Sequence, residues 1–416
     1  MYAQRMTKLY APTNDYAPSE DVLHLVNLDQ SKQPLIPRLQ LLNWTTGRLF
    51  LPWLHLLLPP SLSEIHIDLN GGSATPVNVA VIKALPTTHL QHVAFSTVHT
   101  NPEVDAALLE LILASRHLKS VYIQQETSSE GLRGGGIEEQ TELEDLTSII
   151  IPFKNEPTFL QSLFDRATLP NIRQIYLQHS GKTEWSNPDG LFDSVLRSAS
   201  PRVLHALRYT SHYHGIDITS ARIRLLQSFT ALRTVRVTSL CGASGCKFFL
   251  CDEDISIIAN AMPNLVELHL GGTPCSSTLV NVSMTSLATL ATNCTKIRDL
   301  QIHFDTAGFI NRVLDVPAER PIPPRATSSS CQLTQLSVGR IPLNRAMDGY
   351  WVVGMALLQI FPNLTNIKCH QPQLGLGGRE WGEVMRIVRV QRNVVNSMSG
   401  ASDGIVRVRV SNTKPV

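Results

Sequence analysis

The sequence lacks an excess of charge of either sign. Its 416 residues carry 36 Lys and Arg against 34 Asp and Glu, a formal net charge of +2, and the basic residues form no run. Such a balance creates no field that would attract nucleic acid or an anionic membrane. We therefore expect no nucleic acid and no membrane among the partners of this chain.

Long apolar runs and paired cysteines are also missing. The most apolar short run, residues 51–60 (LPWLHLLLPP), is too short to cross a bilayer. The opening residues MYAQRMTKLY have no apolar core of the kind found in a signal peptide. Seven cysteines are scattered without paired spacing, which is typical of reduced intracellular thiols. The sequence predicts a cytoplasmic or nuclear protein.

No catalytic signature is found. The sequence contains no G-x-S-x-G, no H-E-x-x-H and no kinase motif. The glycine-rich segment 131–136 (GLRGGG) lacks the Lys-Ser/Thr pair that would make it a phosphate-binding loop. We predict that the chain is not an enzyme and binds no cofactor, with an unrecognised enzyme kept as the remaining alternative.

Three cysteines and two histidines form one group of possible metal ligands. Cys241, Cys246 and Cys251 are evenly spaced, and His212 and His214 precede them. Zinc sites prefer closely paired ligands such as C-x-x-C, and four intervening residues are unusual. Buried or loop thiols are the preferred interpretation, with zinc as the alternative, so the sequence predicts no metal site.

The sequence does contain a repeat. The pattern L-x-x-L-x-L, with Ile, Val and aromatic residues allowed, recurs about twelve times at a mean spacing of roughly 30 residues. Several copies open with similar phrases: PNIRQIYL, PNLVELHL and PNLTNIKC. The copies begin at Leu39, Leu62, Leu90, Leu118, Leu146, Ile172, Leu204, Leu232, Leu265, Ile297, Leu333 and Leu364.

The repeat predicts a leucine-rich-repeat solenoid of the α/β class. The last two apolar positions of each copy are two residues apart, so they lie on one side of a short strand. Helical apolar spacing follows in 102–116, 254–261, 285–292 and 350–361. Strands that alternate with helices pair in parallel through right-handed crossovers. We expect a curved parallel sheet on the concave side and helices on the convex side; an ordinary doubly wound domain would not repeat one strand motif so often.

The expected organisation has two parts. Residues 1–375 form the solenoid, with polar loops near 124–142 and 316–330. Residues 376–416 form a C-terminal capping helix, a short strand and a frayed tail. In the helix, Trp381, Val384, Met385 and Val388 form the expected inner face. Arg5–Leu9 looks like a partial repeat, which suggests missing sequence upstream and predicts self-association of the isolated chain.

Four segments carry a family resemblance. The opening YAQRMTKL, the segments PRLQLLNW and LPWLHLLLPPSLSEIHI, and the P-N-L-x-x-L-x-L phrases resemble fungal, mushroom-type F-box/leucine-rich-repeat proteins over roughly residues 1–375. The resemblance implies the substrate-recognition half of a cullin-type ubiquitin-ligase receptor. In that family an F-box docks the ligase adaptor, but no L-P-x-E-[IL] signature precedes residue 5. Binding of adaptor and cullin is therefore expected only if an F-box lies upstream.

Strand alternation predicts which side chains face a protein partner. They are the residues between and beside the buried pair of each copy. Any one-sided sheet shows a polar row, but Tyr and Arg are enriched among binding anchors. The inserted loops are the competing contact surface. The predicted contact residues on the concave face are Tyr122, Gln174, Tyr176, Gln178, Arg208, Arg236, Glu267 and His269.

The predicted function is therefore binding of another protein. The first hypothesis is the target-binding half of an F-box receptor. The second is a stand-alone leucine-rich-repeat scaffold or an inhibitor-type binding protein without a ligase role. An F-box in the reading frame upstream of Met1 would separate the two.

Overall fold

A computed structural model defines the fold, and two compact units, Met1–Lys247 and Phe248–Val416, are described separately. The residues that the structure describes are 5–10, 36–44, 54, 58–69, 75–98, 102–125, 140–154, 158–181, 188–212, 218–239, 248–271, 282–306, 330–338, 347–369 and 377–399.

The main sheet is entirely parallel and has thirteen strands. Those of the first unit, in their order in the sheet, are β1 (Lys8–Tyr10), β2 (Leu41–Trp44), β3 (Glu64–Asp68), β4 (His92–Val98), β5 (Ser120–Gln125), β7 (Ser148–Phe153), β9 (Gln174–His179), β10 (Ala206–Ser211) and β12 (Thr234–Ser239). Those of the second are β14 (Glu267–Leu270), β15 (Asp299–Gln301), β16 (Gln335–Val338) and β17 (Asn366–Cys369).

These strands confirm the predicted repeat. Each of the twelve sequence copies carries one strand, and the partial repeat at Arg5–Leu9 overlaps β1. Inside the strands, buried and half-buried residues alternate, as in β5, β7, β9 and β10. The apolar pairs of the motif, such as Leu207 and Tyr209, are the buried members. The chain is therefore an α/β repeat protein of the leucine-rich-repeat-like solenoid type.

Within each unit, neighbouring repeats are joined by hydrogen bonds at the start of the strands. The amides of Thr147 and Ser148 both donate to the carbonyl oxygen of Lys119 in the preceding repeat, at 2.9 and 3.2 Å. The Thr147 hydroxyl donates to the same oxygen at 3.0 Å. Hydroxyls at the equivalent position of other repeats do the same: Ser63 to Gln40, Thr334 to Arg298 and Thr365 to Thr334. Within each unit, the main chain of every strand of this sheet after the first is therefore set by the repeat before it.

The asparagines of the P-N phrases add a second link. Asn171 donates from Nδ2 to the carbonyl oxygen of Glu144, and Asn363 donates to that of Cys331, both at 2.8 Å. Each bond reaches the connection of the preceding repeat, where a backbone acceptor would otherwise need water. The repeated phrase thus has a structural role in stacking.

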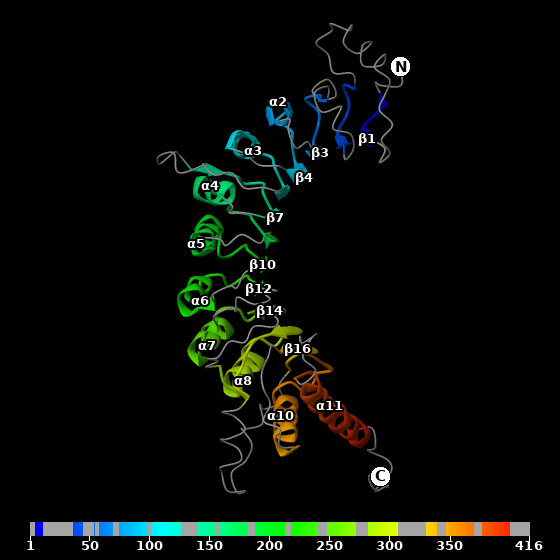
Figure 1. Ribbon diagram of the computed structural model, residues 1–416, viewed down its shortest axis with the longest axis vertical. Coiled ribbons are helices and arrows are strands. Elements are labelled where there is room, and N and C mark those ends of the chain that lie inside the picture. Colours follow the sequence, from blue (N-terminus) through cyan, green and yellow to red (C-terminus); the bar gives the residue numbers. More distant parts are fainter. Residues whose placement is uncertain are drawn as a thin grey trace. The chain divides into compact units, whose positions relative to one another are not determined.

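The helices of the first unit lie on one side of its strands (Figure 1). Contiguous members contact one another along the series from α2 to α6. The prediction of a helix over 102–116 is confirmed by α3, in which Val104, Leu108, Leu111 and Ile112 are buried. The five helices are α2 (Thr75–Ala84), α3 (Pro102–Ala114), α4 (Thr158–Arg166), α5 (Pro188–Ser198) and α6 (Ser220–Leu226).

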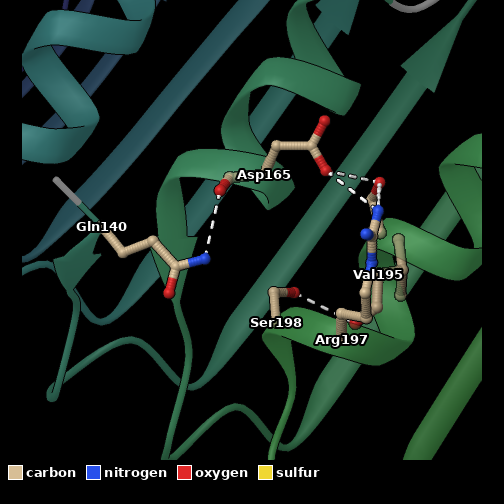
Figure 2. A network of polar contacts seen from close by, with 6 residues as sticks. Gln140, Asp165, Val195, Arg197 and Ser198 are labelled. Atoms are coloured by element: carbon tan, nitrogen blue, oxygen red, sulfur yellow. Dashed lines mark hydrogen bonds and ion pairs between the residues drawn. The ribbon is translucent and has the colours of Figure 1, made fainter. Parts of the chain in front are cut away.

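A polar network links α4 and α5 (Figure 2). The buried Ser194 hydroxyl donates to Asp165 Oδ1 at 2.6 Å. Arg197 Nη2 lies 3.4 Å from the same carboxylate oxygen and 3.0 Å from the Ser194 hydroxyl. Gln140 Nε2 donates to the main-chain oxygen of Asp165 at 3.4 Å. The network joins helices of successive repeats on the side away from the half-buried strand residues.

The second unit contains α7 (Asp252–Ala261), α8 (Met284–Asn293), α10 (Met347–Ile360) and α11 (Gly377–Ser399). The sequence predicted helices at 254–261, 285–292 and 350–361, and α7, α8 and α10 confirm them. Helix α11 packs against α10 and β17. Its predicted inner face is confirmed, since Trp381, Val384, Met385 and Val388 are buried. Trp381 also meets Phe304 edge to face, with ring centroids 6.2 Å apart.

Some predictions fall outside the described residues. The strand expected at 404–410 and the frayed tail lie there, as does the loop at 316–329. Only the ends of the loop at 124–142 are described, because β5 includes Gln124 and Gln125 and a short strand β6 covers Thr141–Glu142. Among the helices of the described ranges, none combines the length and apolarity that crossing a bilayer requires.

Candidate partner-binding face

The face considered for partner binding is formed by side chains that point away from the apolar core in strands β5, β7, β9, β10 and β12. We call it the open face. It has three positions on each of the five strands: Ser120, Tyr122, Gln124, Ser148, Ile150, Pro152, Gln174, Tyr176, Gln178, Ala206, Arg208, Thr210, Thr234, Arg236 and Thr238. All but Thr238 remain at least partly exposed.

Strand register brings the predicted aromatic and basic residues into one row. Tyr122 pairs with Ile150 across β5 and β7, and Ile150 pairs with Tyr176 across β7 and β9. Tyr176 in turn pairs with Arg208, and Arg208 with Arg236. Since neighbouring strands lie about 4.8 Å apart, these five side chains form a continuous strip across the open face.

Both tyrosines have a glutamine partner two residues further along the strand. Tyr176 Oη donates to Gln178 Oε1 at 2.7 Å, and Gln178 Nε2 lies 2.8 Å from His212 Nε2. Tyr122 repeats the arrangement, with Oη 3.4 Å from Gln124 Oε1. These bonds hold the rings in place before any partner binds, which lowers the entropy lost on association. The third predicted member of β9, Gln174, is exposed at the start of the strand.

The open face carries basic but no acidic side chains. Its charged members are Arg208 and Arg236, which are half-buried and occupy paired positions. One residue before each strand, Arg173, His205 and Arg233 follow one another in successive repeats. Partial burial, and then the charges of Arg233 and Arg173, hold the pKa of His205 below its usual value. The local field therefore favours a negatively charged contact.

The two predicted contact residues in the second unit have different surroundings. Glu267 and His269 do point away from the core of β14, but the His269 side chain is only 9% exposed. Gln301, which pairs laterally with His269, and Ser337, which pairs laterally with Gln301, are buried as well. On β14, β15 and β16, these three outward-pointing residues are therefore buried. His269 was predicted to contact a partner, but its side chain does not lie on an open surface. Strand alternation predicts the direction of a side chain, but it does not predict whether other parts of the protein bury that side chain.

The described cysteines bear on the question of metal and thiol chemistry. Cys251, Cys294 and Cys331 are free thiols. Cys251 Sγ lies 3.3 Å from Asp254 Oδ2. Burial, together with Cys331, raises the pKa of the Cys294 thiol to about 12, so this sulfur stays protonated and unreactive at neutral pH. Cys241, Cys246 and His214, which belong to the same group of possible ligands, lie outside the described residues.

Comparisons with known proteins do not identify a family for this chain, so its classification depends on the repeat fold. No model of a known protein family matches the chain. No curated protein matches it either. The resemblance to F-box/leucine-rich-repeat proteins therefore stays a prediction made from sequence motifs.

Proposed function

We propose that this chain is a non-catalytic protein-binding solenoid that holds an acidic segment of another protein against the open face of β5–β12. The observation that carries the proposal is the strip in which Tyr176, Arg208 and Arg236 lie on successive strands. Aromatic rings and guanidinium groups are the side chains most often found as binding anchors.

The charges of the face support an acidic occupant. Arg208 and Arg236 occupy paired positions on β10 and β12, so one acidic segment that crosses these strands can contact both side chains. A guanidinium also binds a carboxylate through two parallel hydrogen bonds, which gives directional specificity. The tyrosines and Ile150 beside them provide an apolar contact for the remainder of the segment.

A narrower version places the chain in ubiquitin ligation. There it would be the substrate-recognition half of an F-box receptor, and its full-length form would bind the ligase adaptor and cullin through an F-box. This version rests on the sequence resemblance alone. The alternative within the same proposal is a stand-alone scaffold or inhibitor-type binding protein, and co-purification of adaptor and cullin with the native protein would distinguish the two.

Charge reversal on the open face tests the proposal. The chain and a variant with R208E and R236E are each used to capture proteins from the cells of origin, and bound proteins are quantified by mass spectrometry. A matched control, R224E, reverses an exposed charge on α6, on the helix side. The proposal expects at least one protein that the wild type and R224E retain equally and that R208E/R236E loses.

The captured protein is then tested directly. We expect R208E/R236E to weaken its binding by at least about tenfold, equivalent to about 1.4 kcal/mol. The wild-type affinity should fall as salt is added, because a charge contact is screened. The proposal would be contradicted if every captured protein were retained equally by the wild type, R224E and R208E/R236E.

A further inference from the structure

Three potential metal ligands converge on β14 and β15 in the second unit. Glu267 and His269 are two residues apart on β14, so they point to the same side of the strand. Asp299 on β15 pairs laterally with Glu267. One ligand atom from each of the three side chains lies within 4.8 Å of the others. The topology thus gathers one imidazole and two carboxylates on a single side of the sheet.

The separations match those of atoms that share an ion. His269 Nε2 lies 3.1 Å from Asp299 Oδ1 and 3.6 Å from Glu267 Oε1. Two ligand atoms each about 2.1 Å from a zinc ion are about 3.0 Å apart at a right angle and about 3.4 Å apart at the tetrahedral angle. The two histidine–carboxylate distances lie near this range, and the third separation, between the Glu267 and Asp299 oxygens, is at most 4.8 Å.

The histidine nitrogen supplies an independent observation. The His269 side chain is more than nine-tenths buried, and its Nε2 atom makes no hydrogen bond. Its nearest carboxylate oxygen, Asp299 Oδ1 at 3.1 Å, is in ion-pair range but forms no hydrogen bond with it. A buried polar atom without a hydrogen bond is unfavourable. When several side chains bind one ion, their ligand atoms point at the ion and not at one another. An ion bound between these residues would therefore give the His269 nitrogen a partner.

A neighbouring side chain holds the Asp299 carboxylate. Gln335 on β16 pairs laterally with Asp299, and its Nε2 lies 3.2 Å from both Asp299 oxygens. Outer residues that fix a ligand in this way are a regular feature of metal sites. They orient the carboxylate and reduce the entropy that the side chain loses on coordination.

We propose that Glu267, His269 and Asp299 bind a divalent transition-metal ion, such as Zn²⁺, and that this ion cross-links β14 to β15. The mixed imidazole and carboxylate donors favour such an ion over Ca²⁺, which takes oxygen ligands only. Three protein ligands leave a further coordination position for water or for an outside donor. Two nearby carboxylates provide the negative charge that offsets the ion.

Calorimetric titration of the chelator-treated full chain with Zn²⁺ tests the site. We expect saturable binding that H269A and the nearly isosteric E267Q weaken by more than the roughly 10- to 100-fold typical of losing an outer partner. The control is H117A, which removes a histidine 3.0 Å from Asp145 in an exposed pair that no third ligand joins within the described part of the chain. H117A should bind like the wild type. Far-ultraviolet circular dichroism of each variant verifies folding.

Cobalt substitution identifies the donors. A Co²⁺ complex at this site should show d–d absorption without the sulfur-to-cobalt charge-transfer band of a thiolate site. The band's presence, together with loss of binding in C251S, would place the metal at the cysteines and overturn the proposal. Absence of saturable binding to the wild type, or wild-type affinity in E267Q, would overturn it equally. Neither result would affect the proposal for the open face, which lies in the other unit.

Discussion

Gly181 and the carbonyl oxygen of Lys154 are so close that a Cβ atom on Gly181 would lie 1.2 Å from that oxygen. Lys154 follows β7, and Gly181 follows β9 in the next repeat of the sheet. Beside this contact, His179 Nε2 lies 3.2 Å from the same oxygen, and the His179 ring stacks on Phe153. The absence of a side chain at Gly181 is thus what lets two successive repeats approach here.

Substitution of Gly181 by alanine should destabilise the first unit. The new methyl group meets backbone rather than a flexible side chain, so the chain itself must move. We expect a loss of about 3 kcal/mol in the free energy of unfolding, the upper part of the range for overpacking. Urea denaturation measures the loss, and hydrogen exchange should localise it to residues 174–181.

The matched control for this prediction is Gly382 in α11. A Cβ there meets nothing within 4 Å, and alanine favours a helix by about 1 kcal/mol over glycine. G382A should therefore stabilise the protein slightly. If G181A were as stable as the wild type, the backbone at Lys154 and Gly181 would be able to move apart without a cost in stability, and the prediction would be wrong.

Alkaline pH should weaken the second unit through Cys294. Burial, aided by Cys331, raises the pKa of Cys294 to about 12 from its ordinary 9.0. Between these values the unfolded chain releases the thiol proton while the folded chain keeps it, so stability falls as pH rises above about 9. The expected slope is about 1 kcal/mol per pH unit. Chemical denaturation between pH 8 and about 10.5 measures it, and C294A should make the dependence shallower; an unchanged slope in C294A would refute the assignment.

Removal of the Ser194 hydroxyl should weaken the link between α4 and α5 more than removal of Arg197. Ser194 is fully buried and donates to a carboxylate at 2.6 Å, and hydrogen bonds to charged groups contribute about 1.5–3 kcal/mol. The Arg197 side chain is 72% exposed, so its ion pair contributes less than about 1 kcal/mol. Unfolding free energies of S194A and R197A test the order, and equal losses would contradict it.

The metal proposal predicts a role for Gln335 that stability alone would not reveal. Q335A removes the donor that holds both Asp299 oxygens. We expect Zn²⁺ affinity to fall by about 10-fold, while the metal-free variant unfolds like the metal-free wild type to within about 1 kcal/mol. A change in metal-free stability with no change in affinity would make Gln335 a purely structural residue.

The repeat fold was predictable because its signal is both local and recurrent. Each copy, such as Leu204-Leu207-Tyr209, places its apolar residues on the inner side of one strand whatever its neighbours are. Helices α2, α4, α5 and α6 were not predicted. In α6, only Ile223 and Leu226 are buried within Ser220–Leu226, which is too little periodicity to detect without its tertiary surroundings.

The candidate sites were predictable only in part. Alternation correctly gave the direction of Tyr176 and Arg208, because side-chain direction is a property of the strand. It could not give the cover over His269, which depends on tertiary structure. The Glu267–His269–Asp299 group was also missed. The usable signal is a Glu-x-His sequence on one strand and an Asp on the next strand that pairs laterally with the Glu. This signal can be recognised only when the lateral register of the two strands is known.

The alternation in β5–β12 has a consequence for how recognition can change. Inward residues such as Leu207 are buried in the core of the stack, whereas Arg208 beside it points to the other side of the strand and is only half-buried. Substitutions at open-face positions can thus accumulate one repeat at a time with little thermodynamic penalty. Such a surface can acquire new specificities while its folding determinants remain untouched.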